Sequence, residues 1–253
     1  MEYDLSIVSS VLLIMKLYGR RPVYERVKAN PQTIKKILED SDFYDSGILN
    51  LAREKKIRVE KIHPRQFYKL SHGKTAQGII AEVEEYNYVE FDDIVSLPDE
   101  NKPILIFLDC LSDPQNLGSI LRTLACIGGF CIVLPKRDTV EVTESVLRVA
   151  SGGENYVPIC LVSNLSTSIQ RAKKEGYTIA STIIEGGKNL DELCLDFPLG
   201  IIFGSEGEGI RPVLERYVDY KLTLPMYGAK LSFNVAVTVA IVCYEVDRQR
   251  RKT

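Results

Sequence analysis

Short apolar runs alternate with amphipathic segments of helical spacing along the second half of the chain. The runs Ile104–Leu108 and Leu199–Phe203 are continuous and apolar, as expected for strands buried on both faces. Between them, Ile120, Leu121, Leu124 and Ile127 fall on one face of an expected helix, which Gly128 and Gly129 end. Further strands are expected at 130–134, 157–162, 177–184 and 220–224, and helices at 117–127, 141–150, 167–175 and 234–248. Strands that alternate with helices predict a parallel sheet covered on both faces, an α/β fold.

The first third of the chain predicts a separate, smaller α/β unit of about 70 residues, within the usual size of a domain. Helices are expected near 23–29, 48–55 and 65–70, and strands at 33–38, 58–62 and from Gly78. The acidic segment that follows ends in two prolines and predicts a linker with a short helix at 92–96. The expected organisation is an N-terminal extension at 1–16, a small domain at 17–86, a linker at 87–102 and a larger domain at 103–253.

The apolar run Ile7–Met15 does not predict a membrane segment. It is far shorter than the roughly 20 apolar residues that span a bilayer, and no basic residue precedes it as in a secretory signal. The segment "KLYGRRPVYERV" after Met15 is a more natural beginning for a folded domain. We therefore expect residues 1–14 to be an upstream-start or non-native extension, which the mass of the protein from its native host would test.

Positive charge is concentrated in the N-terminal third. Between Lys16 and Ile80 there are 15 Lys and Arg against 7 Asp and Glu, whereas the whole chain has a net charge of -2. This excess favours a polyanionic partner such as RNA, although a lysine-rich solvated surface explains it equally well.

The cysteines and histidines limit which metal sites and catalytic mechanisms the chain can have. The six cysteines form no CxxC pair or zinc-type cluster, which indicates reduced thiols in a cytoplasmic protein and no metal site. The two histidines, His63 and His72, lie in the N-terminal third, so histidine-based catalysis in the larger domain is excluded.

Three polar, glycine-bearing loops follow three of the apolar strands. They are "DCLSDPQNLGSILRT" from Asp109, "GSEGEGI" from Gly204 and "PMYGAKLSFN" from Pro225. In parallel sheets, ligands bind beyond the carboxyl ends of the strands, and loops rich in backbone amides suit a polar organic ligand such as a nucleoside. The second loop lacks the GK[ST] ending of a phosphate-binding loop and carries two glutamates, and its glycine order is not GxGxxG.

Taken singly, the polar residues of these loops have ordinary structural explanations. Asn116, Ser232 and Asn234 could each cap the N-terminus of a helix, and Arg122 could be an exposed helix arginine. The glycine loop could be a turn that leads into a helix whose first turn contains Pro212.

Together, the loops resemble the three motifs of the SpoU/TrmH family of RNA 2′-O-ribose methyltransferases, in the SPOUT superfamily. The motifs are "LDCLSDPQNLGSILRT", "IIFGSEGEGI" and "LPMYGAKLSFNVAVTVAIVCYE", in the family's order and spacing. The segments "YGRRPVYERV" and "AQGIIAEV" resemble the start and end of the L30e-like RNA-binding domain of bacterial enzymes that methylate large-subunit rRNA. The resemblance covers nearly everything from Tyr18 to about Arg248.

The resemblance implies a knotted α/β methyltransferase domain, a homodimer, and S-adenosylmethionine (AdoMet) as the cofactor. Gly204, Leu224 and Phe233 match positions that contact AdoMet largely through their backbone. Arg122 matches the arginine that binds the adjacent phosphate, and Glu206 matches a glutamate that either orients this arginine or accepts a proton. Asn116, Ser232 and Asn234 would hold the substrate and the loops by neutral hydrogen bonds.

The implied reaction is methylation of a ribose 2′-OH, with a guanosine of 23S rRNA or a pre-ribosomal particle as the expected substrate. A tRNA methyltransferase of the same family and a catalytically inactive RNA-binding protein are the alternatives. Two departures from the family pattern bear on the substrate and the pocket: Phe233 stands where leucine is usual, and "ENY" after Gly153 lacks the usual histidine.

Overall fold

The computed structural model describes residues 14–43, 45–71, 76–205, 209–229 and 231–252. The chain divides into two compact units, one ending at Asn87 and the other beginning at Tyr88. None of the helices in these ranges combines the length and the apolar character needed to cross a bilayer.

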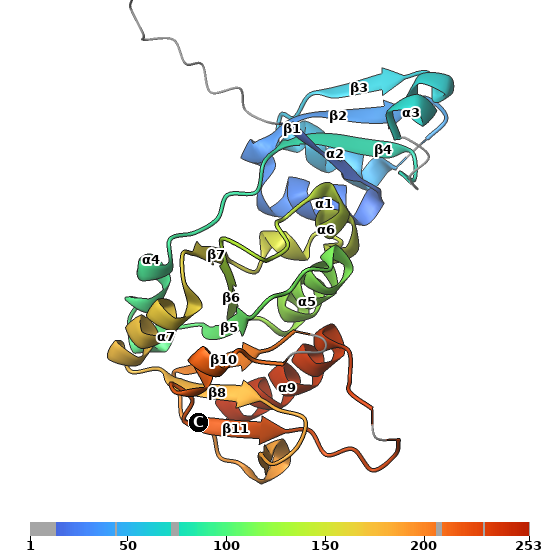
Figure 1. Cartoon of the computed structure of the whole chain (residues 1–253). Coiled ribbons are helices and arrows are strands. Elements are labelled where there is room, and N and C mark those ends of the chain that lie inside the picture. Colours follow the sequence, from blue (N-terminus) through green and yellow to red (C-terminus); the bar gives the residue numbers. More distant parts are fainter. Residues whose placement is uncertain (1–13, 44, 72–75, 206–208, 230, 253) are drawn as a thin grey trace, which may run out of the picture. The chain divides into compact units, whose positions relative to one another are not determined.

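The N-terminal unit, over its described residues, is a four-stranded sheet with three α-helices (Figure 1). Its strand order is β1-β4-β2-β3, with β1 and β2 antiparallel to β4 and β3 parallel to β2. Its elements are β1 (Ile14–Tyr18), α1 (Arg20–Ala29), β2 (Ile34–Asp40), α2 (Ser46–Glu54), β3 (Val59–Ile62), α3 (Pro64–Ser71) and β4 (Ile79–Glu84).

Strand β1 is a correction to the sequence-based interpretation, which placed residues up to 16 in an extension. Ile14, Met15 and Lys16 pair in register with Glu84, Val83 and Glu82 of β4. The strand was missed because its first residues continue the apolar run that begins at Ile7, with no turn signal between them.

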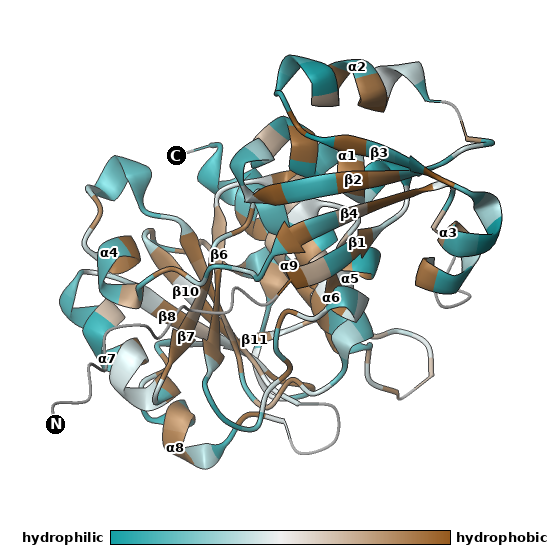
Figure 2. Cartoon of the chain, turned by 90° about the horizontal axis from the view of Figure 1, so that it is seen from above, coloured by the Kyte–Doolittle hydropathy of each residue, from teal (hydrophilic) through white to brown (hydrophobic). Residues whose placement is uncertain are grey.

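The larger unit is built on a seven-stranded sheet of order β7-β6-β5-β10-β8-β11-β9, and every neighbouring pair is parallel. Figure 2 shows β6 and β7 as largely hydrophobic strands, as expected for a central parallel sheet. Its strands are β5 (Ile104–Leu108), β6 (Phe130–Pro135), β7 (Ile159–Val162), β8 (Thr178–Thr182), β9 (Lys188–Asn189), β10 (Leu199–Phe203) and β11 (Tyr220–Thr223). The expected parallel sheet is confirmed, and only the two-residue β9 was not anticipated.

Helices cover this sheet on both sides (Figure 1). Helix α5 packs against α6 and α9, whereas α7 packs against α4 and α8. The helices are α4 (Phe91–Val95), α5 (Pro114–Ile127), α6 (Glu144–Ala150), α7 (Leu165–Lys174), α8 (Pro212–Glu215) and α9 (Val235–Arg250). Ile120, Leu121 and Leu124 of α5 are fully buried, which confirms the predicted apolar face at these three positions, whereas Ile127, the fourth, is only partly buried.

The segment expected to be a linker is part of the larger unit. Phe91 and Val95 of α4 are buried in its core, and the backbone N–H of Val89 donates to the carbonyl of Ile159. The short helix expected at 92–96 is present as α4, one residue earlier. The acidic composition of this stretch concealed its two core residues.

Candidate active site

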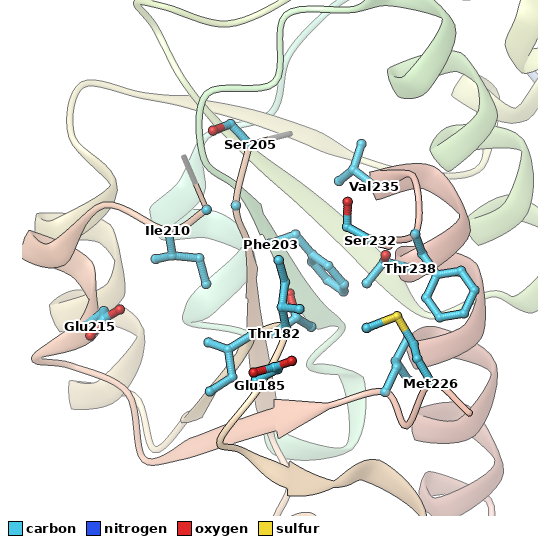
Figure 3. A pocket seen from close by; sticks show the side chains of 16 residues that line it. Thr182, Glu185, Phe203, Ser205, Ile210, Glu215, Met226, Ser232, Val235 and Thr238 are labelled. Carbon is cyan, nitrogen blue, oxygen red and sulfur yellow. The ribbon is translucent and has the colours of Figure 1, made fainter. Parts of the chain in front are cut away.

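The segments that follow β8, β10 and β11 line one pocket at the carboxyl edge of the sheet. Its volume is about 590 Å³, within the range of small-molecule sites. Figure 3 shows Ser205 and Ile210 on one side of it and Ser232, Val235, Thr238 and Met226 on the other. The lining residues are Thr182, Ile183, Ile184, Glu185, Phe203, Gly204, Ser205, Gly209, Ile210, Glu215, Leu224, Met226, Ser232, Phe233, Val235 and Thr238.

The pocket contains four of the residues singled out in the sequence. Gly204 comes from the loop after β10, Leu224 directly follows β11, and Ser232 and Phe233 precede α9. Because β5, β8, β10 and β11 are parallel, their following loops emerge at the same edge and can converge. The convergence expected for the second and third motifs is therefore observed.

Gly204 occupies a position that admits no side chain. A Cβ atom there would lie 2.2 Å from the carbonyl carbon of Gly209 and 2.5 Å from the backbone nitrogen of Ile210. The backbone N–H of Ser205 donates to the carbonyl of Gly209 at 3.0 Å, and the N–H of Gly209 donates back at 3.2 Å. Gly209 has a φ of 71°, which favours glycine. The two glycines therefore approach each other closely, and at both positions only backbone is present to line the pocket.

A hydrogen bond between two asparagines joins the first motif to the third. Nδ2 of Asn234 donates to Oδ1 of Asn116 at 3.0 Å, and Asn116 is buried. Asn234 caps α9, because its Oδ1 accepts from the backbone N–H of Ala236. The capping alternative is confirmed for Asn234 and wrong for Asn116, which lies within the first turn of α5.

Asp113 is the residue that caps α5. Its carboxylate accepts from the backbone N–H of Gln115 at 2.8 Å, and Pro114 takes the first helical position. The pair Asp-Pro is a recognisable helix start, so the helix could have been placed three residues earlier than 117. Because Asp113 fills the capping position, the side chain of Asn116 serves instead to hold the third motif.

Asp109 and Arg211 tie the first motif to the second, and the sequence did not single them out as site residues. The Asp109 side chain is fully buried and lies 2.6 Å from the guanidinium of Arg211. It also accepts from the backbone N–H of Arg211 at 3.0 Å. The hydrogen bond to Asp109 raises the pKa of Arg211. This ion pair fixes the end of the glycine loop beside β5.

Arg122 does not line this pocket but is exposed in a shallow hollow between α5 and α9. The hollow has a volume of about 620 Å³ and is otherwise lined by Thr123, Cys126, Ile127, Ala240, Ile241 and Tyr244. Among the described residues, Arg122 forms no ion pair. Arg122 is thus an exposed helix arginine, as one interpretation expected.

Two glycines allow close packing between α5 and the region of α6. A Cβ on Gly153 would lie 2.9 Å from Cα of Arg122, and a Cβ on Gly118 would lie 2.5 Å from Cβ of Val149. Gly118 is the glycine of the first motif, and Gly153 is the second glycine after "AS". Both therefore set the depth at which α5, and with it Arg122, packs against the region of α6.

Glu206, the remaining candidate, lies outside the described residues. Within the described ranges, no group of three or more His, Cys, Asp and Glu side chains is arranged to hold a metal ion.

Family models match both units of the chain. Residues 103–244 match the SpoU rRNA methylase family, and residues 16–89 match the RNA 2′-O ribose methyltransferase substrate-binding domain. The chain belongs to the SpoU rRNA methylase family.

Several relatives of this SpoU protein share nearly its whole length. A TrmH family protein of Staphylococcus saprophyticus, named as a tRNA/rRNA methyltransferase, is 35% identical over 92% of this chain and 95% of its own. The YacO protein of Bacillus subtilis, similarly named, is 29% identical over 92% of this chain and 94% of its own. A tRNA/rRNA methyltransferase homologue of Synechocystis is 34% identical, and there the match spans 76% of this chain but 50% of the relative.

Solved structures share the fold of this SpoU protein. The SpoU methyltransferase AviRb of Streptomyces viridochromogenes, solved with AdoMet, has a TM-score of 0.78 at 19% identity, over 95% of this chain and 92% of its own. An AdoMet-bound rRNA methyltransferase of Sinorhizobium meliloti has a TM-score of 0.76 at 19% identity, over 93% and 87%. The expected family, α/β fold and enzyme class, an RNA methyltransferase that uses AdoMet, are confirmed.

Proposed function

We propose that this protein transfers the methyl group of AdoMet to a ribose 2′-OH of RNA, most specifically a guanosine of 23S rRNA, in the cytoplasm. The observation that carries the proposal is the convergence of three distant motifs. The second and third line one pocket, and side-chain bonds from Asn116 and Asp109 join the first motif to both.

The pocket beside Gly204 fits AdoMet in shape and chemistry. It offers backbone at Gly204 and apolar surface at Leu224, Met226 and Phe233, which suit an adenosine. Glu185 also lines it and forms no ion pair with any described residue, so its carboxylate favours a cationic ligand. We propose that Gly204, Leu224 and Phe233 hold the cofactor, largely through their backbone.

Bound AdoMet would supply a methyl group already activated on a sulfonium, so the demand on the protein is to position and deprotonate the ribose 2′-OH. A fixed hydroxyl converts a bimolecular encounter into an oriented one, which is a large part of enzymatic acceleration. Asn116, Ser232 and Asn234 are neutral hydrogen-bonding groups on adjoining loops, suited to holding substrate and loops.

Arg122 is proposed to bind the neighbouring phosphate. A guanidinium is protonated throughout the physiological range and matches phosphate in a two-pronged geometry, so positioning suits it better than accepting a proton. Glu206 is proposed either to orient Arg122 or to accept the proton. Retention of all these residue types speaks against the alternative of an inactive RNA-binding protein.

The protein is proposed to act as a homodimer through the α5–α9 face. Ile241 and Tyr244 of α9 are 41% and 70% exposed and adjoin the hollow that contains Arg122. Apolar side chains gathered beside a functional arginine favour a surface that a second copy covers. The proposal also includes the trefoil knot, in which the C-terminal segment threads through a loop of the chain. It is supported by the pocket, which the segment between β11 and α9 lines together with the glycine loop.

One assay tests the reaction and its substrate. The protein is incubated with methyl-labelled AdoMet and either unmodified ribosomal RNA or tRNA, and digested RNA is searched for 2′-O-methylnucleosides by mass spectrometry. Label in one guanosine of 23S rRNA is the expected result. If only tRNA is labelled, the proposed substrate is wrong but the proposed reaction stands. If methyl groups are found only on bases, the proposal of ribose methylation is overturned.

A further inference from the structure

Helix α3 of the N-terminal unit carries an exposed tyrosine and two exposed cations on one side. Tyr68 is 71% exposed, and Arg65 and Lys69 beside it are exposed as well. On a helix, residues three and four positions apart are neighbours, so Arg65 adjoins both Tyr68 and Lys69 and the three side chains lie on the same side of α3. Figure 2 shows α3 as a largely hydrophilic helix.

The opposite face of α3 anchors it to the sheet. Phe67 is buried in a cluster with Tyr18, Leu38 and Ile80. Tyr18 and Leu38 both pair with Ile80 in the strand register, so all three belong to one face of the sheet. The exposed face of α3 is thus presented on a helix that core packing holds in place.

The charges on this face are not neutralised by ion pairs with the described part of the protein. Arg20, Arg21, Lys35, Lys36 and Arg58 of the same unit each form an ion pair with a carboxylate. Within the described residues, Arg65 and Lys69 form none. The charges of Arg65 and Lys69 are therefore available to a polyanion such as RNA.

An exposed aromatic ring beside unpaired cations is an arrangement that binds unpaired nucleotides. A base stacks on the ring face, while the cations contact neighbouring phosphates, and this recognition tolerates any base. Duplex RNA offers no splayed base for a ring to stack on, so the same face favours single-stranded segments such as loops.

We infer that Arg65, Tyr68 and Lys69 form a stacking platform that binds an unpaired nucleotide of the RNA substrate outside the methyl-transfer site. The inference deepens the proposed function, because it rests on RNA as the substrate, and it assigns to this unit a preference for unpaired segments. Tyr68 supplies the ring, and Arg65 and Lys69 supply the phosphate contacts.

Binding of two fluorescent RNAs tests the platform directly. The probes are a 12-nucleotide oligouridylate and a 12-base-pair RNA duplex, whose affinities for the full-length protein are measured by anisotropy. Tyr68→Ala is expected to weaken oligouridylate binding by about 10-fold or more, whereas Tyr68→Phe keeps the ring and the affinity. The duplex affinity should be insensitive to both substitutions.

The cations are tested by salt dependence. Removing Arg65 and Lys69 together should reduce the slope of log affinity for the oligouridylate against log salt by about 1.4, two phosphate contacts on a single strand. The matched control removes the exposed cations Lys28 of α1 and Arg53 of α2, and should leave the slope unchanged. Equal effects of the two double substitutions would overturn the platform, since they would reveal only general attraction.

An assay of methyl transfer distinguishes a failure of this inference from a failure of the proposed function. With ribosomal RNA as the substrate, Tyr68→Ala should raise KM several-fold and leave kcat and AdoMet affinity unchanged. If the wild-type protein methylates RNA but Tyr68→Ala binds and reacts like it, the platform is wrong and the proposed function stands. If the wild type methylates neither rRNA nor tRNA but Tyr68→Ala loses oligouridylate binding, the proposed function fails and the platform stands.

Discussion

At the scale of the residue, Arg122 is the side chain whose role is most open to test. It is exposed, forms no ion pair within the described residues, and does not line the pocket proposed for AdoMet. A residue so placed can act on RNA without contributing to cofactor binding.

Arg122→Ala is therefore expected to lower kcat by about 100-fold or more, the usual effect of removing one preorganised electrostatic contact. AdoMet affinity, measured by calorimetry, should not change. Arg148→Ala removes another exposed arginine of the same unit and serves as the control. A loss of AdoMet affinity in the Arg122 variant would contradict its assignment to the RNA.

Asp109→Ala is expected to lower the free energy of unfolding by about 2 kcal/mol, because a buried acceptor is removed while the partly exposed Arg211 can turn to solvent. Weaker AdoMet binding should accompany it, since Asp109 fixes the end of the glycine loop. Urea unfolding and calorimetry measure the two effects. Asp93→Ala, an exposed carboxylate of α4, should change neither, and the same result for Asp109 would exclude its role.

Residue-level prediction from the sequence succeeded where the motif spacing was specific. Gly204, Leu224, Ser232 and Phe233 were placed together, and they line one pocket. The Asp109–Arg211 pair was missed because its members are 102 positions apart and only the fold reveals that they meet. Asn116 was open to misinterpretation because an asparagine near a helix start resembles a cap until Asp113 is seen to fill that position.

At the scale of the element, the packing of α5 depends on contacts too close for a side chain. Continuous apolar runs were enough to predict β5 and β10, since strands buried on both faces carry little else. The closeness of α5 to α6 could not be predicted, because it follows from two glycines whose neighbours are distant in sequence.

Gly153→Ala is expected to lower the free energy of unfolding by about 1–3 kcal/mol, as overpacking does, because the new methyl group would meet the backbone of Arg122. Catalysis should fall further than stability alone explains, since α5 carries Arg122. Thermal unfolding and methyl transfer below the transition measure this. Gly228→Ala, with open space around its Cα, is the control for stability, and equal stability of both variants would refute the packing argument.

At the scale of the whole molecule, the excess of Lys and Arg in the N-terminal third favoured RNA as a partner from composition alone. The two units were separable in the sequence because a parallel α/β pattern begins anew at Ile104. Their boundary was less accurate, since Phe91 and Val95 sit in an acidic stretch and yet belong to the larger core.

Ile241→Lys is expected to convert the proposed dimer to a monomer, because it would bury a second cation beside Arg122 in an apolar interface. Light scattering coupled to size-exclusion chromatography gives the mass. Thr167→Lys places the same charge on α7, a different helix, and should leave the mass unchanged. A dimer that persists in the Ile241 variant would place the contact elsewhere.

The residues that line the pocket proposed for AdoMet lie between Thr182 and Thr238 in the sequence. During synthesis, the ribosome must therefore release the start of α9 before the binding site exists. The cofactor cannot guide the early folding of the chain, and it stabilises only molecules in which the last segment has docked. Chains that end before the start of α9 would therefore not compete for the cellular supply of the cofactor.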